Sequence, residues 1–266
     1  METGTGRVLL TGATGRVGRL LVPALRHAWP ECDWRIFGRD DTPVPARAVV
    51  ALWGRTSGAA EALRENEALA LRAQALGHAA GADRVMHMSS IAVYDPAVHC
   101  PGETADTVHA KADGYGAAKL RMERAALGSD RGPAAVILRL ANVVGADSLA
   151  PALRDGHARI TRFDDGSGPR RSMIAPGDLA AIIARLVTLD RDRLPRILNV
   201  AAPVPIDMID LARAANCVVE PAEPTATDRR LAQMDSGALR ALWPDMRMAE
   251  TAEAMIADWR RWSAAA

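Results

Sequence analysis

The chain has 266 residues, of which 33 are Lys or Arg and 32 are Asp or Glu, so its formal net charge is +1. Balanced charge without a basic stripe disfavours nucleic acid as a partner. A chain of this length can fold without disulfides or a structural metal. The three cysteines have neither CxxC nor Cys/His spacing, so we expect reduced thiols and no metal site.

The first residues, METGTGRVLLTG, enter an apolar, strand-like run without the pattern of a signal peptide. No later stretch approaches the roughly 18 apolar residues that a membrane span needs. We therefore expect a cytoplasmic protein without a membrane partner.

Short apolar runs alternate with longer stretches of helical period, which is typical of βαβ units. Strands are predicted at 7–10, 34–37, 48–53, 84–88, 135–140 and 197–200. Helices are predicted at 17–27, 61–80, 114–127, 178–189, 206–215 and 251–262. The pattern predicts an α/β fold of the Rossmann type, a doubly wound parallel sheet with a small C-terminal substrate lobe.

Three glycines, Gly12, Gly15 and Gly18, follow the first predicted strand and open the first predicted helix. A tight turn, a close approach of the backbone to a pyrophosphate and close helix–strand packing require glycine at this spacing. Free N–H groups at the helix start favour an anion, and Thr14 adds a hydroxyl donor. The turn predicts a dinucleotide site, although a turn that only needs positive φ also selects glycine.

The choice of dinucleotide depends on the end of the second predicted strand, FGRD. An acidic residue there binds the ribose 2′-hydroxyl, whereas an arginine accepts a 2′-phosphate. Arg39 lies 21 residues after Gly18, and Arg16 adds a second positive charge, which favours NADP over NAD. Asp40 keeps NAD open, and a solvated Arg39 is the structural alternative.

A catalytic set follows from the fourth predicted strand and the next helix. Ser90 ends the strand, and Tyr115 and Lys119 lie one helical turn apart at the start of the helix. A phenol has a pKa near 10, and an adjacent cation favours the phenolate. We predict that Tyr115 exchanges a proton with a substrate oxygen, that Ser90 hydrogen-bonds this oxygen, and that Lys119 tunes the phenol. An exposed YxxxK face is the alternative.

The motifs TGATGRVG, the Asn66 helix, SSIAVY, YGAAK, RLANVVGA and RRSMIAPGDLA occur in the order of the extended short-chain dehydrogenase/reductase superfamily. The chain resembles its NAD-dependent epimerase/dehydratase group, which includes UDP-galactose 4-epimerase. For Asn66 the resemblance implies a contact that supports Lys119, and an N-cap-like role is the alternative. It also implies a homodimer through a contact that includes helix 114–127. We assign to cofactor binding Gly12, Thr14, Gly15, Arg16, Val17, Gly18, Arg39, Leu52, Asn66 and Lys119.

The resemblance also implies substrate contacts. Asn142 matches a family asparagine that contacts the phosphate or glycosyl part of the substrate. Arg171 matches an arginine that clamps the pyrophosphate of a nucleotide sugar, for which a guanidinium is suited. A salt bridge of Arg171 with Asp164 or Asp165 is the alternative, and Arg170 is a competing candidate.

We expect the dinucleotide-binding domain to comprise residues 1–145 and 176–202, and the substrate lobe to comprise 146–175 and 203–266. The segment 146–174 is irregular and polar, and 221–224 is rich in proline. Only eight residues separate Arg39 from Ala48. A complete βαβ crossover needs more, so a strand and two helices of the usual pattern are expected to be missing there.

These observations predict an NAD(P)-dependent oxidoreductase or epimerase-type enzyme acting at a hydroxyl or carbonyl carbon of a small molecule. The resemblance implies a sugar nucleotide as substrate. Two alternatives stay open. One is an NADPH-dependent carbonyl reductase of a smaller substrate, because the lobe is short. The other is a dinucleotide-sensing protein without turnover, because elements are missing after Arg39, although the complete Ser/Tyr/Lys set argues against it.

Overall fold

The computed structural model describes residues 6–128 and 132–265. Its centre is a six-stranded sheet in the order β10-β5-β4-β3-β1-β2, and all neighbouring pairs are parallel. The strands are β1 (Val8–Thr11), β2 (Trp34–Ile36), β3 (Ala48–Ala51), β4 (Arg84–Ser90), β5 (Ala134–Leu140) and β10 (Ile197–Val200). The sheet confirms the predicted α/β class, and each predicted strand exists with its ends shifted by a few residues at most.

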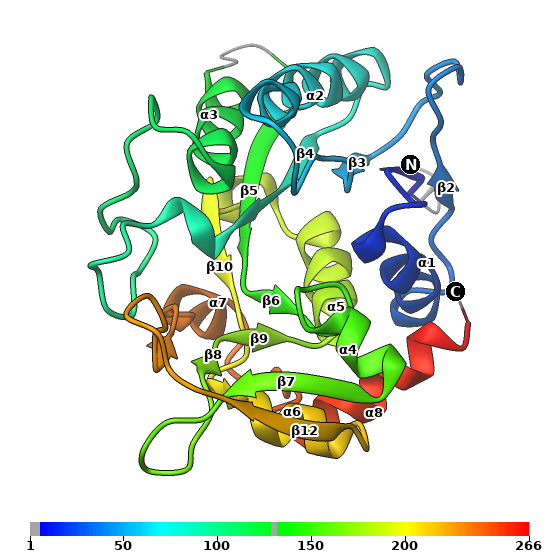
Figure 1. Ribbon diagram of the computed structural model, residues 1–266. Helices are drawn as coiled ribbons and strands as arrows, with labels where there is room; N and C mark the ends of the chain where they lie inside the picture. The colour runs from blue at the N-terminus through cyan, green and yellow to red at the C-terminus, as the bar shows by residue number, and fades with distance from the viewer. Residues whose placement is uncertain (1–5, 129–131, 266) are drawn as a thin grey trace.

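Helices cover both faces of the sheet (Figure 1). On one side α1 (Arg16–Ala28) packs against α5 (Pro176–Thr188) and α8 (Ala252–Ser263). On the other side α2 (Ala60–Ala79) packs against α3 (Tyr115–Leu127). Within the described part of the chain, no helix has the length and apolar character needed to cross a membrane.

The connection between β2 and β3 shapes one end of the sheet. Residues 37–47, all of them described, contain neither helix nor strand, so β2 is an edge strand. The chain leaves β1 toward β2 on one side and, after β2, continues with β3 on the other side of β1. This reversal is a topological switch point, and open α/β sheets bind ligands at the carboxyl ends of strands beside such a point.

The segment after β5 is more regular than its sequence predicts. It contains β6 (Asn142–Val143), α4 (Ala150–Asp155), β7 (His157–Thr161), β8 (Arg170–Arg171) and β9 (Met173–Ile174). The proline-rich segment is partly a strand, because β12 (Val218–Ala222) pairs with β7 and includes Pro221. A two-stranded ribbon has only edge strands, so it tolerates a proline that donates no hydrogen bond.

The last part of the chain adds two short strands and three helices. β11 (Ile206–Asp207) and β13 (Leu231–Ala232) flank β8, and α7 (Gly237–Leu242) follows. The helix predicted at 206–215 is shorter, α6 (Met208–Ala214). Its start is fixed by Asp207, whose carboxylate Oδ1 accepts a hydrogen bond of 2.8 Å from the Ile209 amide. A side-chain cap of this kind defines the first turn.

Candidate active site

The glycine turn lies at the carboxyl end of β1 and fits an anionic group. Gly12 has φ +67°, and a Cβ there would overlap the backbone nitrogen of Trp53. A Cβ on Gly18 would overlap the carbonyl oxygen of Gly12, so helix α1 packs directly on the turn. Gly15 is the N-cap of α1 and gives the helix no side-chain cap. The first N–H groups of α1 therefore have no capping side chain, which suits a pyrophosphate.

Two cavities flank this turn, and Gly15, Leu52 and Gly54 line both of them. The first, the tyrosine cavity, has a volume of about 370 Å³. Its polar side chains belong to Arg16, Thr56, Ser89, Ser90, Tyr115, Asn142, Asp147 and Ser148. The second, the arginine cavity, has a volume of about 440 Å³. Its side chains include Thr14, Phe37, Arg39, Trp53, Arg55, Glu65, Leu69 and Arg72.

The predicted cofactor residues divide between these cavities. Val17 and Arg16 line the tyrosine cavity, whereas Thr14 and Arg39 line the arginine cavity. The Arg16 guanidinium donates a hydrogen bond of 2.8 Å to the Thr56 hydroxyl, so it links the glycine turn to the loop after β3. The two cavities with the glycine turn between them form a groove that is continuous at Gly15, Leu52 and Gly54.

Tyr115 and Ser90 meet in the tyrosine cavity, although they are separated by 24 intervening residues. Burial raises the pKa of the Tyr115 phenol, while hydrogen bonding to Ser90 and the charge of Arg16 oppose this shift. The Ser90 hydroxyl also accepts a hydrogen bond of 3.2 Å from the Ala92 amide. The pair is suited to hold one oxygen atom of a bound molecule.

Lys119 is more deeply buried than Tyr115. Its side chain is buried, and Nζ donates a hydrogen bond of 2.7 Å to the Met88 carbonyl oxygen. Nζ is 5.9 Å from the centre of the Tyr115 ring. Burial lowers the pKa of Lys119 to about 8, and the charge of Glu123 opposes the shift. The charge of Arg16 counteracts the raised pKa of Tyr115.

Asn66 does not cap a helix, because α2 begins six residues earlier, at Ala60. It is buried, and its amide exchanges hydrogen bonds of 3.0 Å with both the N–H and the C=O of Arg55. A Cβ added to Gly54 would lie 3.0 Å from Asn66 Oδ1 and 3.2 Å from Lys119 Nζ. Asn66 thus fixes the loop after β3, and this loop carries Gly54 into both cavities.

Asn142 joins the site because β4 and β5 pair in register, with Ser90 opposite Leu140. Asn142 lines the tyrosine cavity, and its backbone N–H donates to the Ser172 carbonyl oxygen at 3.2 Å. Arg171 precedes Ser172, so it lies beside the strand that carries Asn142. Arg171 does not line the tyrosine cavity.

The carboxylates considered as alternative partners of Arg171 bind a different arginine. Asp164 and Asp165 pair with Arg230, whereas Arg171 donates hydrogen bonds of 2.9 Å to the carbonyl oxygens of Arg170 and Arg229. Burial and the charge of Arg229 lower the pKa of Arg171, and Asp228 opposes the shift. Two guanidinium groups thus influence one another at this place, an arrangement that a bound anion would stabilise.

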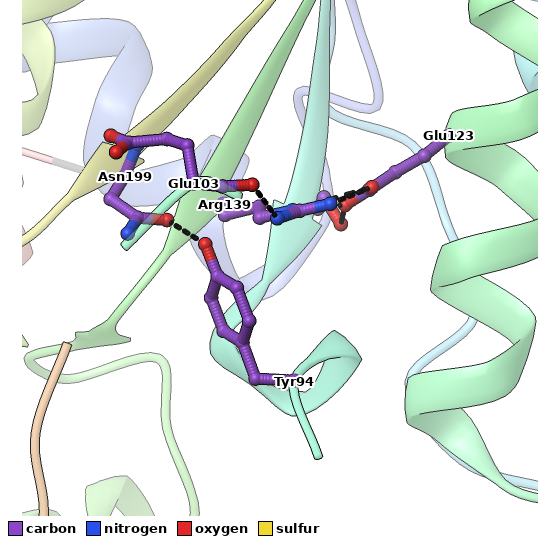
Figure 2. A network of polar contacts seen from close by, with 6 residues as sticks. Tyr94, Glu103, Glu123, Arg139 and Asn199 are labelled. Carbon is purple, nitrogen blue, oxygen red and sulfur yellow. Dashed lines mark hydrogen bonds and ion pairs between the residues drawn. The ribbon is translucent and has the colours of Figure 1, made fainter. Parts of the chain in front are cut away.

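A buried polar network lies behind the tyrosine cavity (Figure 2). Arg139 of β5 forms an ion pair of 2.7 Å with Glu123 of α3, and the two side chains are 4% and 2% exposed. Glu123 also accepts a hydrogen bond of 2.5 Å from Ser89. Arg139 donates to the Glu103 carbonyl oxygen at 3.0 Å and lies 4.8 Å from the centre of the Tyr94 ring. The helix with Tyr115 is thereby attached to the strand that precedes Asn142.

The same network reaches the last strand of the sheet. The Tyr94 hydroxyl points at Asn199 and donates to its Oδ1 at 2.6 Å (Figure 2). Sequence reasoning assigned no role to Glu123, Arg139 or Asn199. Two signals were available, because Glu123 is four residues after Lys119 and Arg139 interrupts the apolar run AVILRLA. A charge inside a buried strand requires a partner.

Asp147 is a further polar group of the tyrosine cavity that sequence reasoning missed. Its Oδ1 atom is buried and has no hydrogen-bond partner. Burial raises the pKa of Asp147 to about 6, whereas hydrogen bonds from the amides of Ala150 and Leu149 and the charge of Arg16 oppose the shift. The cavity therefore contains a carboxyl group whose pKa burial raises well above the ordinary value of an aspartate.

The fold defines a Rossmann-type α/β protein, and its groove runs from the glycine turn to Ser90 and Tyr115. The sequence profile of the family described as "NAD dependent epimerase/dehydratase family" matches residues 35–201. The chain therefore belongs to this family, and its cofactor is NAD or NADP. The matched region contains Ser90, Tyr115, Lys119 and Asn142, whereas the glycine turn precedes it.

Solved structures extend the similarity to nearly the full chain. MoeE5 in complex with UDP-glucose and NAD is 20% identical, with a TM-score of 0.75, over 98% of this chain and 99% of that chain. RMD from Pseudomonas aeruginosa complexed with NADPH is 19% identical, with a TM-score of 0.74, over 97% and 98%. The UDP-glucose 4-epimerase of Thermus thermophilus in complex with NAD is 19% identical, with a TM-score of 0.69, over 96% and 99%. No curated protein matches the chain significantly.

Proposed function

We propose that the protein is an NAD(P)-dependent enzyme that transfers hydride and a proton at a hydroxyl or carbonyl carbon of a sugar nucleotide. The observation that carries this proposal is the convergence of Ser90, Tyr115 and Asn142 on one cavity that continues past Gly15 to the glycine turn. Family membership and the NAD and NADPH bound in the similar structures support it.

A bound nicotinamide supplies the hydride acceptor or donor. Tyr115 exchanges a proton with the reacting oxygen of the substrate, and Ser90 donates a hydrogen bond to the same oxygen. The phenol must lose its proton to act as a base. Burial opposes that loss, whereas Arg16 and Ser90 favour it. Lys119 keeps the β4 backbone and the first turns of α3 in position through its bond to Met88.

The surroundings of Arg171 support a phosphorylated substrate. Arg171 and Arg229 lie close enough for the charge of one to lower the pKa of the other. Guanidinium groups bind phosphate oxygens with paired N–H donors. We infer that this arginine pair binds the diphosphate of a sugar nucleotide whose sugar reaches Asn142 and Tyr115.

A kinetic experiment tests the proposal. The purified protein is incubated with NAD or NADP and a panel of UDP- and dTDP-sugars, and products are followed by nicotinamide absorbance and by chromatography. Tyr115→Phe should lower kcat by about 10²- to 10⁴-fold, the range for loss of general acid–base catalysis, without changing the Kd of the cofactor. Tyr94→Phe is the matched control, because Tyr94 is the other tyrosine of the chain and does not line this cavity. Full turnover by Tyr115→Phe would exclude the proposed role.

A second candidate is a carbonyl reductase of a smaller substrate, because Arg171 lies outside the tyrosine cavity. Arg171→Ala separates the two possibilities. For a sugar nucleotide, KM should rise by about 10-fold or more, since a charge-assisted contact is lost. Unchanged constants on the true substrate would favour the reductase, and cofactor binding without any turnover would favour a sensor.

We also propose a homodimer that uses α3 and the adjacent helix α2. Native mass spectrometry of freshly purified protein measures the oligomeric state and any retained nucleotide in one experiment. A monomeric mass across the accessible concentrations would exclude the dimer.

A further inference from the structure

The charges of the arginine cavity are unevenly balanced. Arg39, Arg55 and Arg72 line it together with one carboxylate, Glu65. Glu65 accepts a hydrogen bond of 2.8 Å from Arg55, so these two charges neutralise each other. The guanidinium groups of Arg39 and Arg72 are left without a carboxylate among the described residues of the lining. A cavity with two such groups favours an anion.

The carboxylates next to Arg39 in the sequence do not supply the missing charge. Asp41 accepts a hydrogen bond of 2.9 Å from the Gly38 amide, so its carboxylate stays in the turn after β2. Asp40 is exposed and does not line the cavity. A protein that binds the free 2′-hydroxyl of an adenosine ribose uses a carboxylate at this position. In the described part of the cavity, none is placed for that task.

Arg72 comes from helix α2, 33 residues after Arg39, and two contacts hold it at the end of β2. Its Nη2 donates a hydrogen bond of 2.9 Å to the Arg39 carbonyl oxygen. Its guanidinium lies over the indole of Trp53, 5.5 Å from the ring centre. Arginine stacks well on tryptophan, and stacking restricts the orientation of the guanidinium plane.

The short connection 37–47 explains why this helix residue reaches the end of β2. Neither helix nor strand lies in the connection, so α2 and the loop after β3 border the end of β2 directly. Trp53 packs against the buried apolar cluster that includes Phe37, and so do Val44 and Ala46 of the connection. A position that a longer connection would cover is therefore open to Arg72.

We propose that Arg72, positioned by Trp53, binds the 2′-phosphate of the adenosine ribose together with Arg39, so that the physiological cofactor is NADP(H). This inference rests on the proposed function, because it assigns the adenosine end of the dinucleotide to the arginine cavity. Each guanidinium offers N–H donors in a fork that matches phosphate oxygens. Arg16 lines the tyrosine cavity instead and takes no part in this contact.

Calorimetry on the full-length protein tests the inference through binding alone. NADPH should bind at least about 10-fold more tightly than NADH, since hydrogen bonds to a charged group are worth this factor or more. Arg72→Gln should weaken the binding of NADPH by about 10- to 100-fold and leave the affinity for NADH unchanged. Arg64→Gln is the matched control, because Arg64 is exposed on the same helix and does not line the cavity.

Two small probes and one further variant sharpen the test. Adenosine 2′,5′-bisphosphate should bind more tightly than 5′-AMP to the wild type, and Arg72→Gln should abolish this difference. Trp53→Leu should reduce the preference for NADPH by a smaller factor than Arg72→Gln, because it removes the platform but not the charge.

Three results would overturn the inference. Equal affinities of the wild type for NADPH and NADH would show that the protein has no 2′-phosphate site. An equal loss of affinity for both cofactors in Arg72→Gln would show that Arg72 contacts a part of the dinucleotide that NADPH and NADH share. In either case turnover that depends on Tyr115 would continue with NADH, so the proposed function would survive. If neither dinucleotide bound, the proposed function would fail as well.

Discussion

The groove has an ion pair at each end, and the two pairs have nearly the same length but opposite surroundings. Behind the tyrosine cavity Arg139 and Glu123 are 2.7 Å apart, and their side chains are almost completely buried. In the arginine cavity Arg55 and Glu65 are 2.8 Å apart, and about half of each side chain is exposed. Water screens the second pair, whereas the first has lost its hydration on folding.

This difference separates two tasks. The buried pair fixes the relative position of α3, which carries Tyr115 and Lys119, and β5, which leads to Asn142. It can do so because separating the two side chains would leave each charge unpaired in the buried interior. The exposed charges of the arginine cavity are free to exchange partners with a ligand. We therefore expect substitutions of the buried pair to lower the free energy of unfolding. Substitutions in the arginine cavity should instead change the affinity for the ligand.

The largest effect is expected for Arg139→Met, which leaves Glu123 as an unpaired buried charge. The free energy of unfolding should fall by about 3–5 kcal/mol, measured by urea denaturation. Arg124→Met is the control, because Arg124 is exposed on the same helix as Glu123. The double variant Arg139→Met/Glu123→Met should recover most of the loss, since both charges are then absent. A loss below about 1 kcal/mol for Arg139→Met would contradict the comparison, because only surface pairs behave in that way.

Lys119 provides a second test at the same end through its pKa of about 8. An unfolded lysine has a pKa near 10.4, so the folded state releases its proton first and stability rises with pH between these values. The wild type should gain up to about 3 kcal/mol of unfolding free energy relative to Lys119→Met between pH 7 and pH 10.5. Other groups titrate equally in both proteins, so their contribution cancels. Parallel stability curves over this range would show that Lys119 is not desolvated in solution.

The two ends of the groove also differ in how far the sequence predicts them. Gly12, Gly15 and Gly18 share one turn, and Tyr115 and Lys119 share one helix, so short-range spacing is enough to identify them. Ser90 joins them because parallel strands place their carboxyl ends at one edge of the sheet. The α/β class was therefore predictable from local patterns, and so was the position of Ser90 and Tyr115 at one cavity.

Arg72 was not predictable in this way. It reaches the end of β2 only because the connection 37–47 is short and because Trp53 offers a ring to stack on. Both conditions depend on contacts between segments far apart in the sequence. The alternative in which Arg171 pairs with Asp164 or Asp165 is wrong for the same reason, since Arg230, 65 residues after Asp165, pairs with that carboxylate. Spacing identifies groups on one element, whereas pairing across elements requires the fold.

Asp147 tests whether the carboxyl group in the tyrosine cavity is as poorly hydrated as its raised pKa indicates. The folded pKa of about 6 lies above the unfolded value near 3.9, so stability falls as the pH rises through this interval. Relative to Asp147→Asn, the wild type should lose on the order of 2 kcal/mol of unfolding free energy between pH 4 and pH 7. Asparagine keeps an oxygen for the amides of Leu149 and Ala150, so the helix start is preserved. Asp155→Asn, in the same segment but exposed, should show no such dependence.

The smallest effect is expected at the exposed pair of the arginine cavity. Glu65→Gln should leave the urea midpoint close to that of the wild type, because solvent already screens both partners. Its consequence should appear in binding, since Arg55 then becomes a third free cation and NADPH should bind somewhat more tightly at low salt. The gain should vanish at about 0.5 M NaCl, where the screening length is roughly 4 Å. A clear loss of stability at either salt concentration would mean that burial does not distinguish the two pairs, and the contrast between the two ends of the groove would have to be abandoned.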